Sequence, residues 1–235
     1  MNLLRAGGPP LVIGHRGAGA VEPENSLASL AAAVAAGADL VEFDVAPGLR
    51  LAHAPQDVDG DSPSLDDALA LLAVRGVGVH VDVKLPGYEH EVVDCLRRHG
   101  LGDRAVLSTA FVEVARRLAV VAPDVSRAIG YPRDRYGISR LRWPALATGA
   151  GAAMLRAAVP WRISLLLRAA RADALALHHA LCSERAVAAA HRRGAPVLAW
   201  TVNDAASVRR LAAMGVDAIV SDDPGMAVAT LRSPA

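Results

Sequence analysis

The sequence predicts an α/β fold, a (β/α)8 barrel that forms a single domain over residues 1–235. The chain has 235 residues, 53% of them hydrophobic, and single barrels of this class reach that length. Short apolar runs alternate with Ala/Leu/Arg segments of helical period, which favours a parallel sheet covered by helices. No internal repeat is visible, and no Pro/Gly/Ser-rich linker divides the chain.

The predicted strands are short apolar or β-branched runs bounded by turn residues. In chain order they are Leu11–Gly14, Leu40–Val45, Leu49–His53, Val77–Val83, Ala105–Ser108, Ser126–Ile129, Ala174–Leu177, Val197–Thr201 and Ala218–Val220. We interpret Leu49–His53 as an extension of the second unit, so eight strands remain, the number that closes a (β/α)8 barrel.

Helical periodicity marks the segments between these strands. Helices are predicted over Ser26–Ala36, Leu65–Val74, Tyr88–His99, Val112–Val121, Ser183–Arg193 and Ala205–Met214, and one more begins at Pro224. Tyr131–Arg171 is the least regular stretch, with eight arginines and one acid. Two interpretations stay open for it: a solvated helix and loop, or a basic surface that meets anionic lipid or substrate phosphate.

Composition excludes several classes of protein. The net charge is +1, from 25 basic and 24 acidic residues, which argues against a nucleic-acid binder. Two cysteines cannot build a disulfide framework. We find no segment of signal-peptide character and no apolar stretch long enough to span a membrane, so we expect a cytoplasmic protein. Lys84 is the only lysine among the 25 basic residues. This is either coincidence or a need for a compact ammonium that arginine cannot replace.

Histidine and arginine side chains follow the first predicted strands. His15 and Arg16 come directly after Leu11–Gly14, and His53 ends Leu49–His53. The carboxyl ends of barrel strands share one mouth, where active sites of this fold lie. A histidine moves protons near neutral pH, and an arginine binds phosphate through two hydrogen bonds. Two histidines that flank a phosphodiester would serve as general base and general acid.

Carboxylates end the next two barrel strands. Glu42 and Asp44 are two residues apart, so their side chains lie on the same side of the strand. Asp82 and Lys84 repeat that spacing one barrel strand later and would add a third carboxylate and a cation. Hard oxygen ligands favour Mg²⁺ or Ca²⁺. The alternative for each pair is a polar strand end that faces solvent.

The order and spacing of these blocks resemble the glycerophosphodiester phosphodiesterase family over residues 12–224. The matching blocks are His15-Arg16-Gly17, Pro23-Glu24-Asn25-Ser26, Gly37 to Val45, His53, Asp82-x-Lys84, Ala199-Trp200-Thr201-Val202-Asn203 and Asp217 to Asp222. Members of this family are (β/α)8 barrels that hydrolyse phosphodiesters with a divalent cation. The resemblance therefore implies the same fold, an enzyme of lipid metabolism, and a Mg²⁺ or Ca²⁺ cofactor.

The resemblance also implies a role for each matching residue. The acid–base pair would be His15 and His53. The metal ligands would be Glu42, Asp44 and Asp82. The substrate contacts would be Arg16 at the phosphate, Lys84 at the charge that develops on it, and Trp200 in the wall of the substrate pocket.

Three departures from the family pattern bear on specificity. Asp82 replaces the usual glutamate, Ala54 replaces the aspartate that usually follows the second histidine, and only Ala54–Pro63 stands where many members carry a long insertion. We expect hydrolysis of a glycerophosphodiester to glycerol 3-phosphate and an alcohol. A phospholipase D-like enzyme on lysophospholipids, with peripheral membrane contact through residues 131–171, is one alternative. An inactive barrel that binds phosphorylated ligands is the other.

Overall fold

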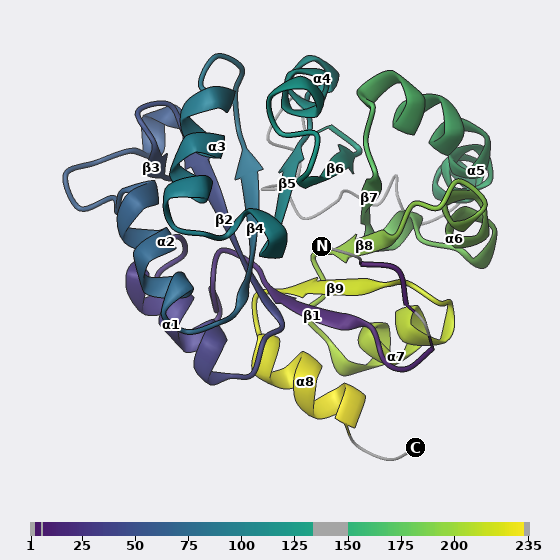
Figure 1. Ribbon diagram of the computed structural model, residues 1–235. Helices are drawn as coiled ribbons and strands as arrows, with labels where there is room; N and C mark the ends of the chain where they lie inside the picture. The colour runs from purple at the N-terminus through teal and green to yellow at the C-terminus, as the bar shows by residue number, and fades with distance from the viewer. Residues whose placement is uncertain (1–2, 6, 134–149, 233–235) are drawn as a thin grey trace.

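The computed structural model describes residues 3–5, 7–133 and 150–232, and it confirms the predicted (β/α)8 barrel (Figure 1). Eight parallel strands follow one another around the ring, and pairing between the first and second strands closes it. These strands are β1 (Leu11–Gly14), β2 (Leu40–Ala46), β4 (Gly78–Val83), β5 (Ala105–Thr109), β6 (Ser126–Tyr131), β7 (Ala174–His178), β8 (Val197–Trp200) and β9 (Ala218–Ser221). The short strand β3 (Arg50–Leu51) pairs antiparallel with β2 and stays outside the ring.

Helices surround the barrel strands in Figure 1. They are α1 (Leu27–Ala35), α2 (Leu65–Ala73), α3 (Glu89–Arg98), α4 (Val112–Val121), α5 (Ala150–Ala170), α6 (Glu184–His191), α7 (Ala205–Ala213) and α8 (Pro224–Arg232). Two of the expected N-terminal helix caps are present. The Ser26 side chain accepts a hydrogen bond from the Ser29 backbone N–H at the start of α1, and the Asp204 side chain accepts one from the Ser207 backbone N–H at the start of α7. Among the described residues, no helix is long and apolar enough to cross a membrane.

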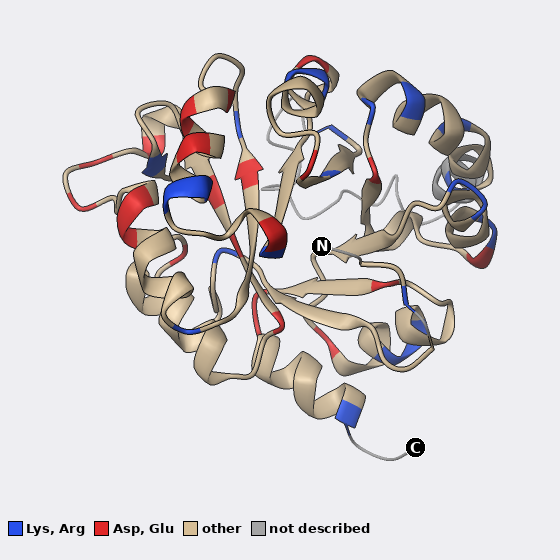
Figure 2. Cartoon of the chain, viewed as in Figure 1, with Lys and Arg blue, Asp and Glu red and all other residues tan. Residues whose placement is uncertain are grey.

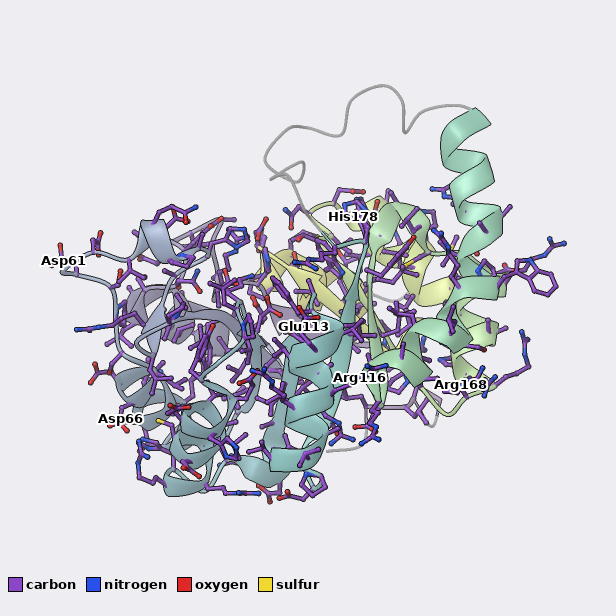
Figure 3. The ribbon with its side chains drawn as sticks, turned by 90° about the horizontal axis from the view of Figure 1, so that it is seen from above. Asp61, Asp66, Glu113, Arg116, Arg168 and His178 are labelled. Carbon is purple, nitrogen blue, oxygen red and sulfur yellow. The ribbon has the colours of Figure 1, made fainter. Side chains whose placement is uncertain are left out.

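The stretch after β6 contains α5, the helix whose bounds the sequence does not predict. The helix α5 runs for 21 residues through Pro160, and the blue segments in Figure 2 show its basic positions. Figure 3 shows its first turns rising above the rest of the barrel. The prediction for Tyr131–Arg171 extends over residues 134–149, which lie outside the described part of the chain.

Small and medium apolar side chains fill the lower interior of the barrel. Strand residues contribute most of this plug: Ile13, Leu40, Val106, Ala128, Ala174, Leu198 and Ala218, with Leu3 packed against them. Two larger apolar clusters lie between the strands and the helices. Because apolar side chains fill the barrel near the amino ends of the strands, its polar cavity lies at their carboxyl ends.

Three aspartates at the start of strands make the same pair of hydrogen bonds, which we call a strand clamp. In each clamp the aspartate backbone N–H donates to a carbonyl of the preceding barrel strand, and its carboxylate accepts from the N–H of that same residue. The pairs are Asp39 with Val12, Asp173 with Arg127, and Asp217 with Val197. Each clamp therefore satisfies an N–H in the first two residues of the preceding strand.

Candidate active site

The carboxyl ends of the strands surround a cavity of ≈ 440 Å³. Its walls come from residues on or directly after all eight barrel strands, together with the loops after β1 and β3. All eight residues that the sequence singles out line it: His15, Arg16, Glu42, Asp44, His53, Asp82, Lys84 and Trp200. The structure therefore brings together groups from across 186 positions of sequence. Seven of them lie on or directly after strands of one parallel ring, and His53 comes from the loop after β3.

The loop after β1 is fixed tightly against α1 and β2. Gly17 has a φ of +84°, and a Cβ there would lie 2.4 Å from the Ser29 carbonyl carbon, so only glycine fits. Arg16 also adopts a left-handed φ of +50°. Its backbone N–H donates to Glu42 Oε2 over 2.7 Å. This strained turn aims the Arg16 side chain into the cavity and ties it to the end of β2.

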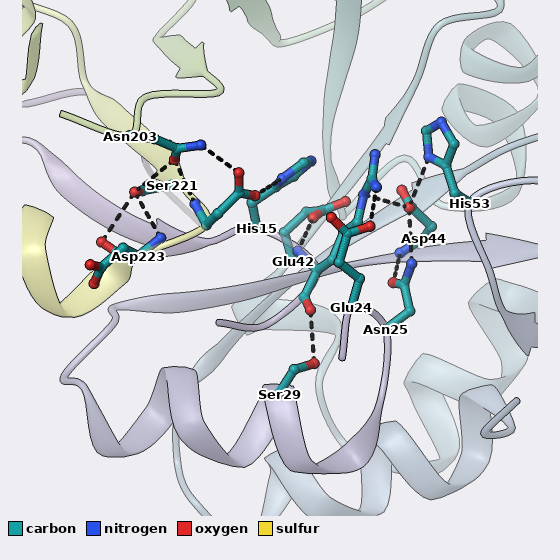
Figure 4. A network of polar contacts seen from close by, with 12 residues as sticks. His15, Glu24, Asn25, Ser29, Glu42, Asp44, His53, Asn203, Ser221 and Asp223 are labelled. Carbon is teal, nitrogen blue, oxygen red and sulfur yellow. Dashed lines mark hydrogen bonds and ion pairs between the residues drawn. The ribbon is translucent and has the colours of Figure 1, made fainter. Parts of the chain in front are cut away.

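A carboxylate orients His15. His15 Nδ1 lies 2.5 Å from Asp222 Oδ1 (Figure 4). Asn203 holds the other oxygen of that carboxylate through its Nδ2, and its Oδ1 accepts from the Asp222 backbone N–H. Burial alone would lower the pKa of His15, but the Asp222 hydrogen bond and the Glu42 charge outweigh it and raise the pKa. His15 therefore has a fixed ring orientation and a bound counter-charge.

Asp44 is the centre of a second network (Figure 4). Its Oδ2 lies 3.1 Å from Arg16 Nε, 3.1 Å from His53 Nδ1 and 3.1 Å from Asn25 Nδ2. The Asn25 amide oxygen in turn accepts from the Asp44 backbone N–H. His53 thus takes its orienting carboxylate from Asp44, although Ala54 stands where the family pattern has an aspartate.

The single lysine bridges two of the carboxylates. Lys84 Nζ lies 2.5 Å from Asp44 Oδ1 and 2.6 Å from Asp82 Oδ2. Asp82 Oδ1 accepts from the Ser108 hydroxyl at 2.7 Å. Burial alone would lower the pKa of Lys84, but Asp44 and Asp82 raise it above its ordinary value. The ammonium is therefore a permanent positive charge at the end of β4.

Negative charge is least compensated at Glu42. Burial raises the pKa of Glu42 to about 7, and the nearby Asp44 charge adds to that rise. Burial alone would raise the pKa of Asp44 as well, but Lys84 and the His53 hydrogen bond hold it well below its usual range. Added positive charge beside Glu42 would therefore be favourable.

The three predicted metal ligands meet at one point. Glu42, Asp44 and Asp82 each offer a carboxylate oxygen, and these oxygens lie within 4.8 Å of one another. An all-oxygen set of this kind suits Mg²⁺ or Ca²⁺. The residues present therefore fit a divalent cation, and the uncompensated charge of Glu42 supplies a further reason for one.

The sequence does not predict the cavity roles of Asp222 and Ser108. Asp222 reads as a helix cap beside Ser221, although its place directly after β9 follows the same strand-end rule as His15. Ser108 carries no signal, because its role depends on the register of β4 against β5. His178 differs from these two, because its place after the predicted strand Ala174–Leu177 already indicates that it could reach the mouth. It lines the cavity and meets Trp200 edge to face, with ring centroids 5.2 Å apart.

Comparisons with known proteins agree with this geometry. A sequence model of the glycerophosphoryl diester phosphodiesterase family matches residues 15–47 and 53–226. A glycerophosphodiester phosphodiesterase from Arabidopsis thaliana is 30% identical over 170 residues, which are 70% of this chain and 44% of the plant protein. The chain thus spans less than half of that relative.

Two solved structures share the fold. A phosphodiesterase from Oleispira antarctica, in complex with the product sn-glycerol-3-phosphate, has a TM-score of 0.74 and 22% identity, over 96% of this chain and 98% of that one. A glycerophosphodiester phosphodiesterase from Agrobacterium tumefaciens has a TM-score of 0.69 and 20% identity, over 94% and 99% of the two chains.

Proposed function

Because the chain belongs to the glycerophosphoryl diester phosphodiesterase family, we propose that it hydrolyses a glycerophosphodiester to glycerol 3-phosphate and an alcohol. One observation carries the proposal: the two histidines, three carboxylates and two cations of the family pattern line a single cavity. The product held by the Oleispira antarctica neighbour is consistent with it. We also propose that residues 1–235 form one domain, since the barrel takes its strands from residue 11 to residue 221.

Positive groups at the mouth would bind and orient the diester. Arg16, fixed by its backbone bond to Glu42, is placed to hold a phosphate oxygen, and Lys84 is placed to offset charge that develops on the phosphoryl group. Glu42, Asp44 and Asp82 would hold the divalent cation. When bound, that cation supplies a Lewis acid that polarises a phosphoryl oxygen.

The two histidines would divide the proton transfers. One removes the proton from the attacking oxygen, which belongs to water or to a neighbouring substrate hydroxyl, as the new P–O bond forms. Where the hydroxyl attacks, the product of this step is a cyclic phosphodiester, and water must then open it to give glycerol 3-phosphate. The other donates a proton to the alcohol oxygen as its bond to phosphorus breaks. Asp222 and Asp44 hold the two rings by their Nδ1 atoms, which leaves each Nε2 available for this exchange.

A direct assay tests the reaction. Purified protein should release glycerol 3-phosphate from glycerophosphocholine when Mg²⁺ or Ca²⁺ is added, and a chelator should stop it. Glu42→Gln should remove both the activity and its dependence on metal. Glu22→Gln, at an exposed position of the loop after β1, is the matched control. Unchanged kinetics in Glu42→Gln would contradict the assigned metal site.

A phospholipase D-like reaction on lysophospholipids is a second candidate, favoured by one feature of α5. Trp161 and Leu165 are four residues apart on this helix, and 86% and 65% of their surfaces are exposed. The helix carries arginines and no acid, a composition suited to an anionic lipid surface. Release of choline from lysophosphatidylcholine alone, with vesicle binding that Trp161→Ser reduces, would favour this reaction over the first.

Binding without turnover defines the remaining alternative. If neither substrate is cleaved and glycerol 3-phosphate still binds, the barrel is an inactive ligand-binding protein, and both enzymatic proposals fail. A cytoplasmic location also stays a prediction, which fractionation of cells that express the chain would test.

A further inference from the structure

A second group of metal-ligating atoms lies outside the barrel, between α2 and α3. Asp66 stands in the first turn of α2, Cys95 on the inner face of α3, and His99 at the end of α3. Cys95 and His99 are four residues apart, so they lie on one side of the helix. The three donor atoms are within 4.8 Å of one another. Figure 3 shows Asp66 far from His178 at the mouth, and none of the three lines the catalytic cavity.

The spacing of these atoms is that of ligands around one small cation. Asp66 Oδ1 lies 3.5 Å from Cys95 Sγ and 3.0 Å from His99 Nε2. For tetrahedral zinc, with Zn–S of about 2.3 Å and Zn–N or Zn–O of about 2.0 Å, neighbouring ligand atoms are about 3.3–3.5 Å apart. The two Asp66 separations need to change by only a few tenths of an ångström, and the donor atoms of Cys95 and His99 lie within 4.8 Å of each other.

We propose that Asp66, Cys95 and His99 form a zinc site, with a water molecule as the fourth ligand. Binding would replace the Cys95 and His99 hydrogen bonds, two of the three that now converge on Asp66 Oδ1. The Cys95 thiol gives its proton to solvent, and His99 binds through Nε2 while it carries its proton on Nδ1. The thiolate and the carboxylate then balance the charge of Zn²⁺.

Ligand chemistry separates this site from the catalytic one. Thiolate and imidazole select Zn²⁺ over Mg²⁺ and Ca²⁺, whereas the three carboxylates of the cavity prefer the harder ions. Arg98 Nη2 lies 3.3 Å from Asp66 Oδ1 and competes for that oxygen. The side chains of Arg98 and Asp66 are each 61% exposed, so the guanidinium can turn into solvent when a cation enters.

Zinc at this point would join two helices that follow one another in sequence. An ion that binds the folded protein stabilises it in proportion to its occupancy. We therefore expect Zn²⁺ to raise the melting temperature, and this effect should be independent of substrate turnover.

Cobalt titration tests the site directly, because Co²⁺ takes tetrahedral thiolate sites and gives a thiolate-to-cobalt charge-transfer band. The full chain is titrated in excess Mg²⁺, which occupies the catalytic carboxylates, with a phosphine reductant that keeps both thiols free. We expect one equivalent of Co²⁺ to produce the band and Zn²⁺ to displace it.

Variants assign the band to this cluster. Cys95→Ala should abolish it and Cys182→Ala should keep it. Asp66→Asn should weaken Co²⁺ binding at least tenfold, whereas Asp94→Asn, an exposed aspartate next to Cys95, should leave it unchanged. Arg98→Gln should bind Co²⁺ at least as tightly as the parent. Circular dichroism confirms that each variant is folded. No band in the parent protein, or a band that persists in Cys95→Ala, would overturn the proposal.

Discussion

At the scale of single residues, we propose that Asp222 acts on the reaction through His15. Its carboxylate holds Nδ1 at 2.5 Å, and Asn203 fixes the carboxylate from the far side. Burial alone would raise the pKa of Asp222, but the His15 bond lowers it, so the group stays charged at neutral pH. This is the arrangement by which a carboxylate selects one tautomer of a histidine.

We predict that Asp222→Asn lowers kcat by about 10- to 100-fold with little change in KM. The amide cannot stabilise an imidazolium as a carboxylate does, so the limb of the pH–rate profile that belongs to His15 should also move. Asp223→Asn is the matched control, because Asp223 caps α8 through the Met226 backbone N–H and an asparagine can do the same. Equal kinetics and equal pH profiles in the two variants would remove Asp222 from the mechanism.

Lys84 is required as a lysine by the geometry around it. The ammonium lies between two carboxylates at 2.5 and 2.6 Å, and a planar guanidinium would present its donors to them in a different geometry. Lys84→Arg should therefore lower activity on the diester by about 100-fold or more while the protein stays folded, which steady-state kinetics and circular dichroism would measure together. A fully active Lys84→Arg would return the single lysine to coincidence.

At the scale of elements, the strand clamps differ in burial. Asp217 is fully buried and its carboxylate also accepts from the Arg5 backbone N–H and from His191 Nε2, whereas Asp39 is exposed. We expect Asp217→Ala to lower the free energy of unfolding by about 3 kcal/mol, because buried donors lose their partner, and Asp39→Ala to lower it by about 1 kcal/mol. Urea denaturation measures both values, and a smaller loss for Asp217→Ala would contradict the ranking.

The sequence predicts where most strands and helices lie, but it predicts their first and last residues less accurately. Each of the nine predicted strands exists, and Val112–Val121 has the predicted bounds. β6 continues two residues past Ile129 because Gly130 and Tyr131 pair with β7, a tertiary contact that local patterns cannot carry. The bounds of α5 could not be predicted, because its Ala-rich sequence has weak periodicity and because a proline such as Pro160 normally ends or kinks a helix.

The sequence predicts which residues line the cavity, but not how they pair with one another. Seven of the eight residues could be placed at one mouth from their position at the end of a strand, and Trp200 from the family resemblance. Their pairings could not, since the contacts of His15 with Asp222 and of His53 with Asp44 depend on how separate loops fold over the barrel. Likewise, nothing in the sequence pairs Asp66 with residues 29 and 33 positions later.

At the scale of the whole molecule, we expect buried histidines such as His178 and His80 to make stability depend on pH, because burial lowers the pKa of each to about 4. The ordinary pKa of a histidine is 6.5, and for His178 the neighbouring His179 adds to the shift. Between pH 6.5 and pH 4 the His178 side chain binds a proton in the unfolded chain but not in the native protein. Its contribution to the free energy of unfolding is therefore fully present above pH 6.5 and is lost as the pH decreases toward 4.

His178→Gln should therefore flatten the loss of melting temperature between pH 6.5 and 4. His90→Gln, at an exposed position of α3, is the control and should keep the slope of the parent. Thermal melts at a series of pH values compare the three proteins. Parallel curves for the parent and His178→Gln would show that this histidine does not carry the acid sensitivity.

The strand clamps also determine where the ring tolerates added chain. They join β1 to β2, β6 to β7 and β8 to β9, and each depends on the short segment that leads into its second strand. Gly215 lies in such a segment and Gly194 does not, although both are left-handed glycines at the end of a helix. A peptide tag inserted at Gly194 should leave every clamp intact, whereas the same tag at Gly215 should open the barrel between β8 and β9. The junction of α6 with β8 is therefore the place to graft a label or a fusion partner onto this protein.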